Sequence, residues 1–440
     1  MKKPPNNHAN NYWPIFMHPK ALFYYGWIIV AILFLAELIG SPTGGPAISL
    51  FFVPMADSLG WSLSQVVGAV TAKSVAGMVV APFMGAMLDR YGARLILTFG
   101  FLFAGIALLF VARVNEIWQL WILFALIGAL SVEGAGRLST PVVLSKWFVR
   151  RRSRAIAIAS SGQLLGGALM APIIGLMIGK VGWRSTWKVL GIAMVVVNVP
   201  LMALLMRNKP EDVGLQPDGA ITGTENAENQ ELNNVSMDAL QEESWTLKEA
   251  IKSRTLWTLL SVFTLITFTG SAVIYHQVNF FTGQGMSRQF ASYVMSTTFL
   301  LGVLARLFWG LAMEHTSVRN SVIVMSMCRA IGTLALIATP YPFNMVGFLL
   351  FWGLLGGAFG LLQPVAFANY FGRRYQGSIQ GAVRPFLELA HMLGPLATAV
   401  AFDSGRSYQF AFGIAFGLAS AASVIALSVS PPIKRTKLPS

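Results

Sequence analysis

The chain of 440 residues contains an internal repeat, and this repeat limits the folds that it can adopt. Residues 141–151 read PVVLSKWFVRR and residues 364–374 read PVAFANYFGRR, so the two segments align without a gap. A second pair, GAMLDR at 85–90 and GLAMEH at 310–315, repeats at almost the same spacing. Self-similarity at a fixed spacing predicts two copies of one structural unit.

Each copy consists of apolar segments of about 20 residues, which is long enough to cross a bilayer of about 30 Å. The chain is 55% hydrophobic and only 11% charged, a composition that excludes an ordinary soluble protein. We therefore predict an all-α integral membrane protein with about twelve transmembrane helices, arranged as two pseudo-symmetric bundles of about six helices each. The predicted spans are residues 22–54, 62–87, 94–112, 117–147, 154–179, 185–206, 255–283, 290–313, 319–340, 343–371, 377–402 and 408–430.

The formal net charge of +14 follows the predicted topology. About twenty-one of the 32 Lys and Arg residues lie at one set of helix ends and about six at the other. The positive-inside rule then predicts that both termini and the central loop are cytoplasmic. Because topology accounts for the basic charge, we expect no nucleic-acid partner.

The polar stretch between the two copies predicts a domain boundary. Residues 208–253 contain ten of the 18 Asp and Glu residues and few apolar ones, so we expect a partly disordered acidic cytoplasmic linker. The remaining predicted parts are a cytoplasmic tail at 1–20, an N-terminal bundle at 21–207, a C-terminal bundle at 254–431 and a second tail at 432–440.

The segment GAMLDRYGAR at residues 85–94 resembles the loop signature Gly-x-x-x-Asp-Arg-x-Gly-x-Arg of the major facilitator superfamily. The resemblance implies a loop that closes the cytoplasmic side of a transporter and opens during transport. The second copy has His315 in place of the Arg, which predicts a weaker charge lock there. The implied gate residues are Gly85, Asp89, Arg90, Gly92, Arg94, Gly310 and Glu314.

Four further stretches resemble the bacterial branch of monocarboxylate-transporter-like and oxalate/formate-antiporter-like proteins. They are YGW at 25–27, GWS at 60–62, KWF at 146–148 and KPEDVGLQPDG at 209–219. These stretches belong to the scaffold, so the resemblance names the branch, whose substrates are small organic anions and above all monocarboxylates, and it implies a bacterial inner membrane as location. The segment PEDVGL at 210–215 also resembles organophosphate transporters, which leaves phosphate esters as an alternative substrate class.

Ionisable residues at membrane depth are the candidate functional residues, because a charge at the bilayer centre costs at least about 2.5–3.5 kcal/mol on insertion scales. The predicted spans contain more bases than acids, which suits a cavity that carries an anion. The acids are Glu37, Glu133 and Glu388, the bases are Lys73, Arg137, Arg306, Arg329 and Arg384, and the titratable additions are His276 and His391.

Arg306 is the strongest candidate for binding the substrate. Its surroundings, LARLFWG at 304–310, resemble the Ala-Arg-Pro-x-x-Gly stretch in which monocarboxylate transporters carry their carboxylate-binding Arg. A guanidinium matches a carboxylate with two parallel hydrogen bonds and keeps its charge. Leu307 and Gly302 depart from the family pattern, so its proton relay does not carry over. Alternatively, Arg306 pairs with an acid from another helix.

Two further Arg residues have an acid on the same helix face. Glu133 precedes Arg137 by four residues, and Arg384, Glu388 and His391 follow one another at spacings of four and three. These groups are either self-compensated structural pairs or sites at which a substrate anion or a proton competes for one partner. On the seventh predicted span, the spacing of Tyr275, His276 and Asn279 permits one polar cluster that faces a cavity.

Glu37 has no basic residue nearby on its own predicted helix. Burial without a partner would favour its protonated form, so Glu37 is a candidate proton carrier. Alternatively, it pairs with Lys73 across the bundle or stays protonated without a role.

The leading hypothesis is a secondary active transporter that moves a small organic anion by alternating access, with proton symport or anion exchange. Its partners would be the anion, protons or a counter-anion, and the lipid bilayer. One alternative is a drug/proton antiporter, although GQLLGG at 162–167 lacks the Pro of the antiporter motif. Another is an anion sensor that does not transport. No nucleotide-binding loop, metal-ligand cluster or nucleophile–base pair appears, so we expect no enzyme, cofactor or metal. The sequence carries no signal for an oligomeric state.

Overall fold

The computed structural model describes residues 24–43, 45–130, 137–219 and 244–434, and every regular element among them is a helix. The first predicted span is interrupted where Pro42, Pro46 and Pro54 remove backbone donors. The N-terminal helices are α1 (Gly26–Gly40), the short helices η1 (Ser41–Thr43) and η2 (Gly45–Phe51), α2 (Phe52–Leu59), α3 (Leu63–Tyr91), α4 (Ala93–Val111), α5 (Ile117–Leu130), α6 (Arg137–Trp147), α7 (Arg152–Ala193), η4 (Met194–Asn198) and η5 (Leu201–Leu205).

The C-terminal half repeats this arrangement after two short linker helices, η6 (Pro210–Val213) and η7 (Pro217–Gly219). A capping box between Thr246 and Glu249 then starts α9 (Leu247–Lys252). The remaining helices are α10 (Arg254–Gly283), α11 (Arg288–Ala312), α12 (Val318–Ala338), α13 (Phe343–Gly347), η9 (Phe348–Leu355), α14 (Phe359–Phe371), α15 (Gln376–Asp403) and α16 (Tyr408–Ala426).

The described residues accommodate the predicted number of spans. Ten helical stretches are long and apolar enough to cross a membrane, and α5 is a shorter apolar helix. One of the ten, residues 152–205, divides at Gly182, whose φ of 79° reverses the chain between the fifth and sixth spans. Together with α5 and α6 as the fourth span, this division confirms the predicted all-helical membrane fold.

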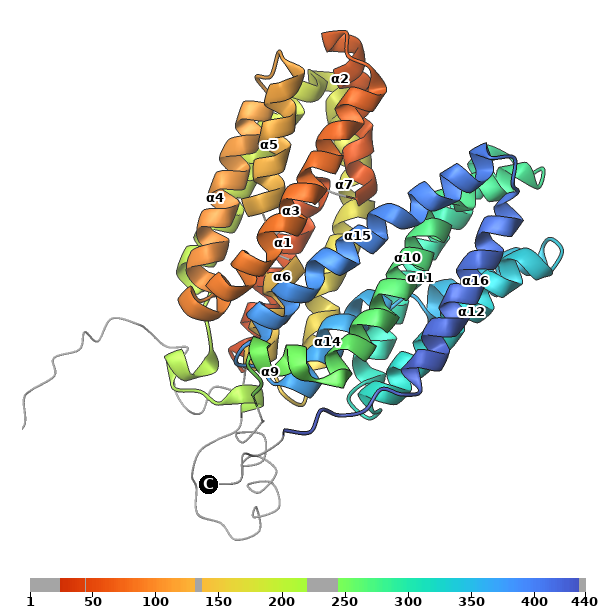
Figure 1. Ribbon diagram of the computed structural model, residues 1–440. Coiled ribbons are helices and arrows are strands. Elements are labelled where there is room, and N and C mark those ends of the chain that lie inside the picture. The colour runs from red at the N-terminus through yellow and green to blue at the C-terminus, as the bar shows by residue number, and fades with distance from the viewer. Residues whose placement is uncertain (1–23, 44, 131–136, 220–243, 435–440) are drawn as a thin grey trace, which may run out of the picture.

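The two halves lean apart at one end and meet at the other (Figure 1). At the closed end the backbones of α3 and α15 pack directly against each other at Gly85. A Cβ on Gly85 would lie only 2.0 Å from the Gly377 carbonyl oxygen, so no side chain fits between them. The second contact between the halves joins α7 and α11, where a Cβ on Gly310 would lie 2.6 Å from the Ala157 Cβ. The glycines at these positions therefore allow the closed end to form.

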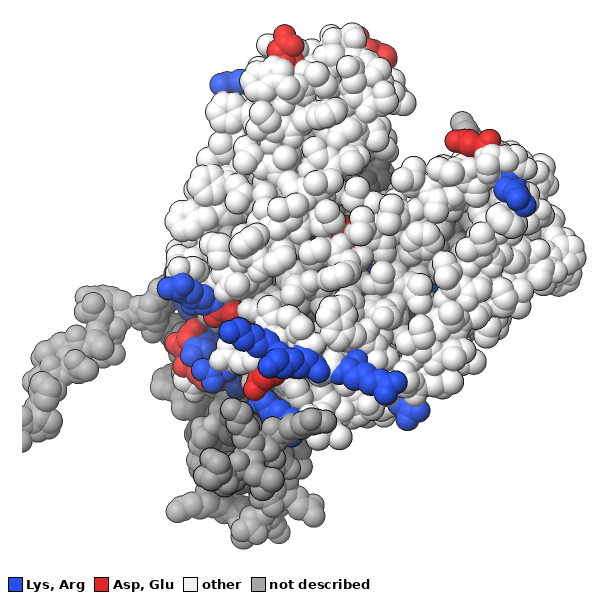
Figure 2. Space-filling model, in the orientation of Figure 1, with Lys and Arg blue, Asp and Glu red and all other residues white. Residues whose placement is uncertain are grey.

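Basic side chains gather at the closed end of the molecule (Figure 2). The first and last described segments lie there too, since Tyr24 donates to the Trp147 carbonyl and Lys434 to the Ser244 carbonyl. The positive-inside rule assigns this end to the cytoplasm. The conformation is then closed toward the cytoplasm and open toward the opposite side.

Candidate functional site

At the closed end of the molecule, the predicted gate residue Asp89 lies at the end of α3 and contacts the other half. Its carboxylate accepts hydrogen bonds from the backbone N–H groups of Gly377 at 3.0 Å and Ser378 at 2.7 Å, and from the Ser378 hydroxyl at 2.8 Å. These donors belong to the first turn of α15, in the other half. The Lys146 ammonium lies 3.9 Å away. Asp89 therefore neutralises the positive N-terminus of a helix across the interface.

The second copy of the signature makes the corresponding contact with different chemistry. Glu314 accepts from the Arg154 guanidinium at 2.6 Å, and the Ser153 hydroxyl donates to the Gly310 carbonyl at 2.8 Å. Arg154 lies in the first turn of α7, so each gate acid meets the start of a helix in the opposite half. Arg154 of the opposite half, and not the signature residue that follows Glu314, therefore supplies the cation of this contact.

The remaining signature residues act within the N-terminal half. Arg94 Nε donates to the Ala203 carbonyl at 2.9 Å, where the sixth span ends, and the Arg94 backbone N–H donates to the Asn208 side chain at 2.9 Å. Gly92, with φ of 80°, breaks the chain between α3 and α4. Arg90 is exposed and lies over the Tyr91 ring. Apart from Arg90, the predicted gate residues therefore divide into those that make contacts across the interface and those that hold the start of the third span.

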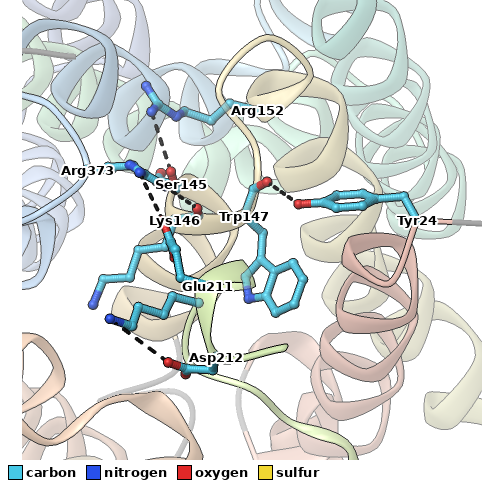
Figure 3. Close-up of polar contacts among 9 residues, drawn as sticks. Tyr24, Ser145, Lys146, Trp147, Arg152, Glu211, Asp212 and Arg373 are labelled. Carbon is cyan, nitrogen blue, oxygen red and sulfur yellow. Dashed lines mark hydrogen bonds and ion pairs between the residues drawn. The ribbon is translucent and has the colours of Figure 1, made fainter. Parts of the chain in front are cut away.

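The start of the linker is ordered and fastened to both halves. The Asp218 carboxylate accepts from the backbone N–H groups of Val149 at 2.8 Å and Arg150 at 2.7 Å, which belong to the N-terminal half. The carboxylate of Glu211 pairs with Arg373 of the C-terminal half at 3.1 Å (Figure 3). Arg373 also donates to the Lys146 carbonyl at 3.0 Å. We call residues 209–218 the linker strap; the composition of the linker does not indicate which of its residues make such contacts.

Arg306 lies between the two halves, one helical turn before the Gly310 contact. Its Nη1 donates to the Ser160 carbonyl of α7 at 2.8 Å, and its Nη2 lies 3.7 Å from the Cβ position of Gly360 at the start of α14. The side chain is half-buried. The guanidinium therefore lies at the interface of the halves, just inside the closed gate.

Within the predicted group on α15, Arg384 and Glu388 make an ion pair one turn apart. The Tyr275 ring lies edge-on to His391, with 5.7 Å between ring centroids, and so extends this group. His276 instead faces α15 and α16, with Nε2 3.0 Å from the Pro395 carbonyl oxygen, and Asn279 is exposed. The three polar residues of α10 thus do not all point the same way.

Glu37 is buried, with 6% of its surface exposed, and accepts a hydrogen bond from Thr140 of α6 at 2.9 Å. Lys73 is also buried and donates to the Thr43 carbonyl. Glu37 is therefore hydrogen-bonded to the fourth span, whose second helix, α6, begins at Arg137. Glu133 lies outside the described residues.

The sequence analysis did not predict the contacts of three residues: Arg154, Asp218 and Thr140. For Arg154 a signal existed: the register of the repeat aligns residue 154 with residue 377. Since Asp89 bonds residue 377, its counterpart Glu314 should meet residue 154, as it does. Asp218 and Thr140 carry no comparable signal.

The comparison with known proteins agrees with this geometry. The model of the Major Facilitator Superfamily matches residues 27–395, so the chain belongs to this family. Monocarboxylate transporter 12 of Rattus norvegicus is 23% identical over 436 residues, which cover 94% of this chain and 88% of that protein. The uncharacterized MFS-type transporter YcxA of Bacillus subtilis (strain 168) is 25% identical over 184 residues, which cover 42% of this chain and 45% of YcxA.

Among solved structures, the proton:xylose symporter XylE, bound to 6-bromo-6-deoxy-D-glucose, matches with a TM-score of 0.72 and 13% identity. The match covers 93% of this chain and 96% of the XylE chain, and it shows a shared fold. The protein is therefore a multi-pass membrane transporter, distantly related to monocarboxylate transporters, and not an enzyme.

Proposed function

We propose that this transporter moves a small organic anion, above all a monocarboxylate, across a bacterial inner membrane by alternating access. The observation that supports it most is the position of Arg306 between the halves, just inside the closed gate. A guanidinium there stays charged and presents donors in a geometry that matches a carboxylate. The names of the monocarboxylate transporters among its relatives agree with this substrate class.

Coupling to protons has a candidate in the Arg384–Glu388 pair of α15. Protonation of Glu388 would cancel its negative charge and leave Arg384 able to attract an anion. Binding of a proton and a monoanion would then be mutually favourable, and their joint movement would be electroneutral. Glu37 is a second candidate because it is buried, with its carboxyl group hydrogen-bonded to Thr140 where α1 contacts α6. Anion exchange would use the same cation site without a proton.

The proposal is tested by uptake into liposomes. Labelled formate, oxalate, pyruvate and lactate are offered with an inside-alkaline pH gradient, without a gradient, and with each anion preloaded. We expect uptake by the wild type and its loss in Arg306→Gln. The control is Arg113→Gln, because Arg113 is an exposed cation at the opposite end of α4.

The outcomes separate the alternatives. Uptake stimulated by the pH gradient supports symport, and uptake only into preloaded liposomes supports exchange. If no anion moves in either format, the proposal is wrong. Movement of amphipathic cations would then support the drug/proton antiporter, and anion binding without flux would support the sensor.

A further inference from the structure

The tenth span is broken beside Arg306. The π-type helix η9 ends at Leu355, a turn covers residues 356–358, and α14 starts at Phe359. A break at membrane depth frees backbone carbonyl groups, which need a donor because lipid supplies none. At Gly356 this donor is Arg329 of α12, whose Nε lies 2.9 Å from the Gly356 carbonyl oxygen.

The guanidinium of Arg329 touches both sides of the break. Its central carbon lies 4.0 Å from the ring centroid of Trp352, which precedes the turn, and 5.9 Å from that of Phe359, which follows it. Both rings are buried, with 6% and 5% exposed. A cation over an aromatic face is stabilised most where water is excluded. One side chain therefore links η9, the turn and α14.

The surrounding helices leave room for this cation only because glycine stands opposite it. A Cβ on Gly270 of α10 would lie 2.7 Å from Arg329 Nη1, and a Cβ on Gly356 would lie 3.2 Å from Arg329 Cγ. One turn further along α12, Gly332 lets the helix backbone contact Trp352. The guanidinium is thus enclosed by the seventh, ninth and tenth spans.

The contacts described for Arg329 are a carbonyl group and aromatic rings, and no ion pair joins it to an acid among the described residues. A neutral donor could satisfy the same carbonyl at lower cost, because a buried charge without a counter-ion is expensive. What the guanidinium adds to the hydrogen bond is its contact with the rings on both sides of the break, which a neutral donor would not stabilise in the same way. Gly360, one turn after Gly356, lies beside the Arg306 guanidinium. The two cations flank the same short stretch of the tenth span, residues 356–360.

We propose that Arg329 is a positioning residue of the anion site: it holds the break in the tenth span so that Gly360 and Arg306 keep the arrangement that binds a carboxylate. This inference rests on the proposed function. Arg306 would contact the substrate, and Arg329 acts through the backbone of residues 356–360.

The test uses two measurements on the full-length protein. Hydrogen–deuterium exchange reports on the amides of residues 353–360, and liposome uptake of the carboxylate that the wild type transports best gives KM and maximal rate. The variants are Arg329→Gln, which removes the charge, and Arg329→Lys, which keeps it. The control is Arg319→Gln, since Arg319 lies on the same helix and also donates to a carbonyl, that of Leu427, at 2.7 Å.

In Arg329→Gln we expect faster exchange confined to the break and a KM raised about tenfold, with the maximal rate little changed. Arg329→Lys should recover part of the KM, and Arg319→Gln should alter neither quantity. Unchanged exchange at residues 353–360, or an unchanged KM, would overturn the inference. If Arg329→Gln does not assemble, hydrogen–deuterium exchange in Arg329→Lys is compared with the wild type. Faster exchange at residues 353–360 supports the inference, and equal exchange contradicts it. If the wild type moves no carboxylate, the proposed function fails while the exchange comparison still decides whether Arg329 holds the break.

Discussion

The gate contact of Asp89 yields the sharpest test of the alternating-access reading. In the conformation described here, its carboxylate accepts three hydrogen bonds from the first turn of α15. These bonds exist only while the cytoplasmic ends of α3 and α15 touch. Replacing Asp89 should therefore favour the state that is open to the cytoplasm, without changing contacts elsewhere.

The size of the shift follows from what each variant retains. Asp89→Ala removes all three bonds, but the donors regain water on opening, so we expect a net loss of about 2–3 kcal/mol. That loss changes the ratio of the two states about 30–150-fold. Asp89→Asn keeps one acceptor oxygen, so it can retain the bonds of Oδ1 or of Oδ2 but not of both, and it also loses the charge–dipole attraction. We expect a smaller loss of about 1–2 kcal/mol, or roughly 5–30-fold in the ratio of the two states.

The assay is a distance measurement between two spin labels on the cytoplasmic side. Labels replace Tyr91 at the end of α3 and Arg374 before α15, in a Cys328→Ser background, because Cys328 is the single cysteine. The long-distance population should rise from wild type to Asp89→Asn to Asp89→Ala. Asp403→Ala, at the exposed far end of α15, is the control and should leave the distribution unchanged. Equal distributions in wild type and Asp89→Ala would refute the reasoning.

Three further predictions concern the same end of the molecule. Exchanging the charges in an Arg154→Glu, Glu314→Arg double variant should recover part of the transport that each single variant loses, with a coupling of about 1 kcal/mol in a double-mutant cycle, since the pair is partly exposed. Asp218→Ala should remove the acceptor that holds the linker strap and lower stability by about 1 kcal/mol, measured by thermal unfolding in detergent, whereas an unchanged melting temperature would show that the strap adds no stability. Gly85→Leu should abolish cytoplasmic closure, because its Cβ would meet the Gly377 carbonyl, and the spin-label pair above should then report mostly long distances; normal closure would contradict the backbone contact.

The sequence predicted the fold well because twelve apolar segments and a repeat are properties of the chain itself. The Arg384–Glu388 pair was equally accessible, since a spacing of four places two side chains on one helix face. The directions of Tyr275, His276 and Asn279 could not be predicted in this way. Because α10 lies between α15 and α16, the spacing of residues does not determine which of these helices each side chain contacts.

The linker illustrates a different limit. An acidic, polar composition describes the average of residues 208–253, and an average conceals single anchoring residues. In the linker strap, the Asp218 carboxylate accepts hydrogen bonds from backbone amides of the N-terminal half. The Glu211 carboxylate pairs with Arg373 of the C-terminal half. Which acid of ten finds such a partner depends on where the ends of the helices lie in space. That information arises only once the bundle has folded.

The two contacts between the halves at the closed end have the same geometry but different donors. The repeat places an acid of each half against the start of a helix in the other half, so the geometry is shared. The chemistry of the two contacts differs. Asp89 accepts hydrogen bonds from backbone amides, whereas Glu314 forms an ion pair with the Arg154 side chain, which is 36% exposed. Backbone amides at a helix start are held in place by the helix, whereas the ion pair of a partly exposed guanidinium is weakened by salt. We therefore expect the contact of α7 with α11, which lies next to Arg306, to depend more strongly on ionic strength than the contact of α3 with α15.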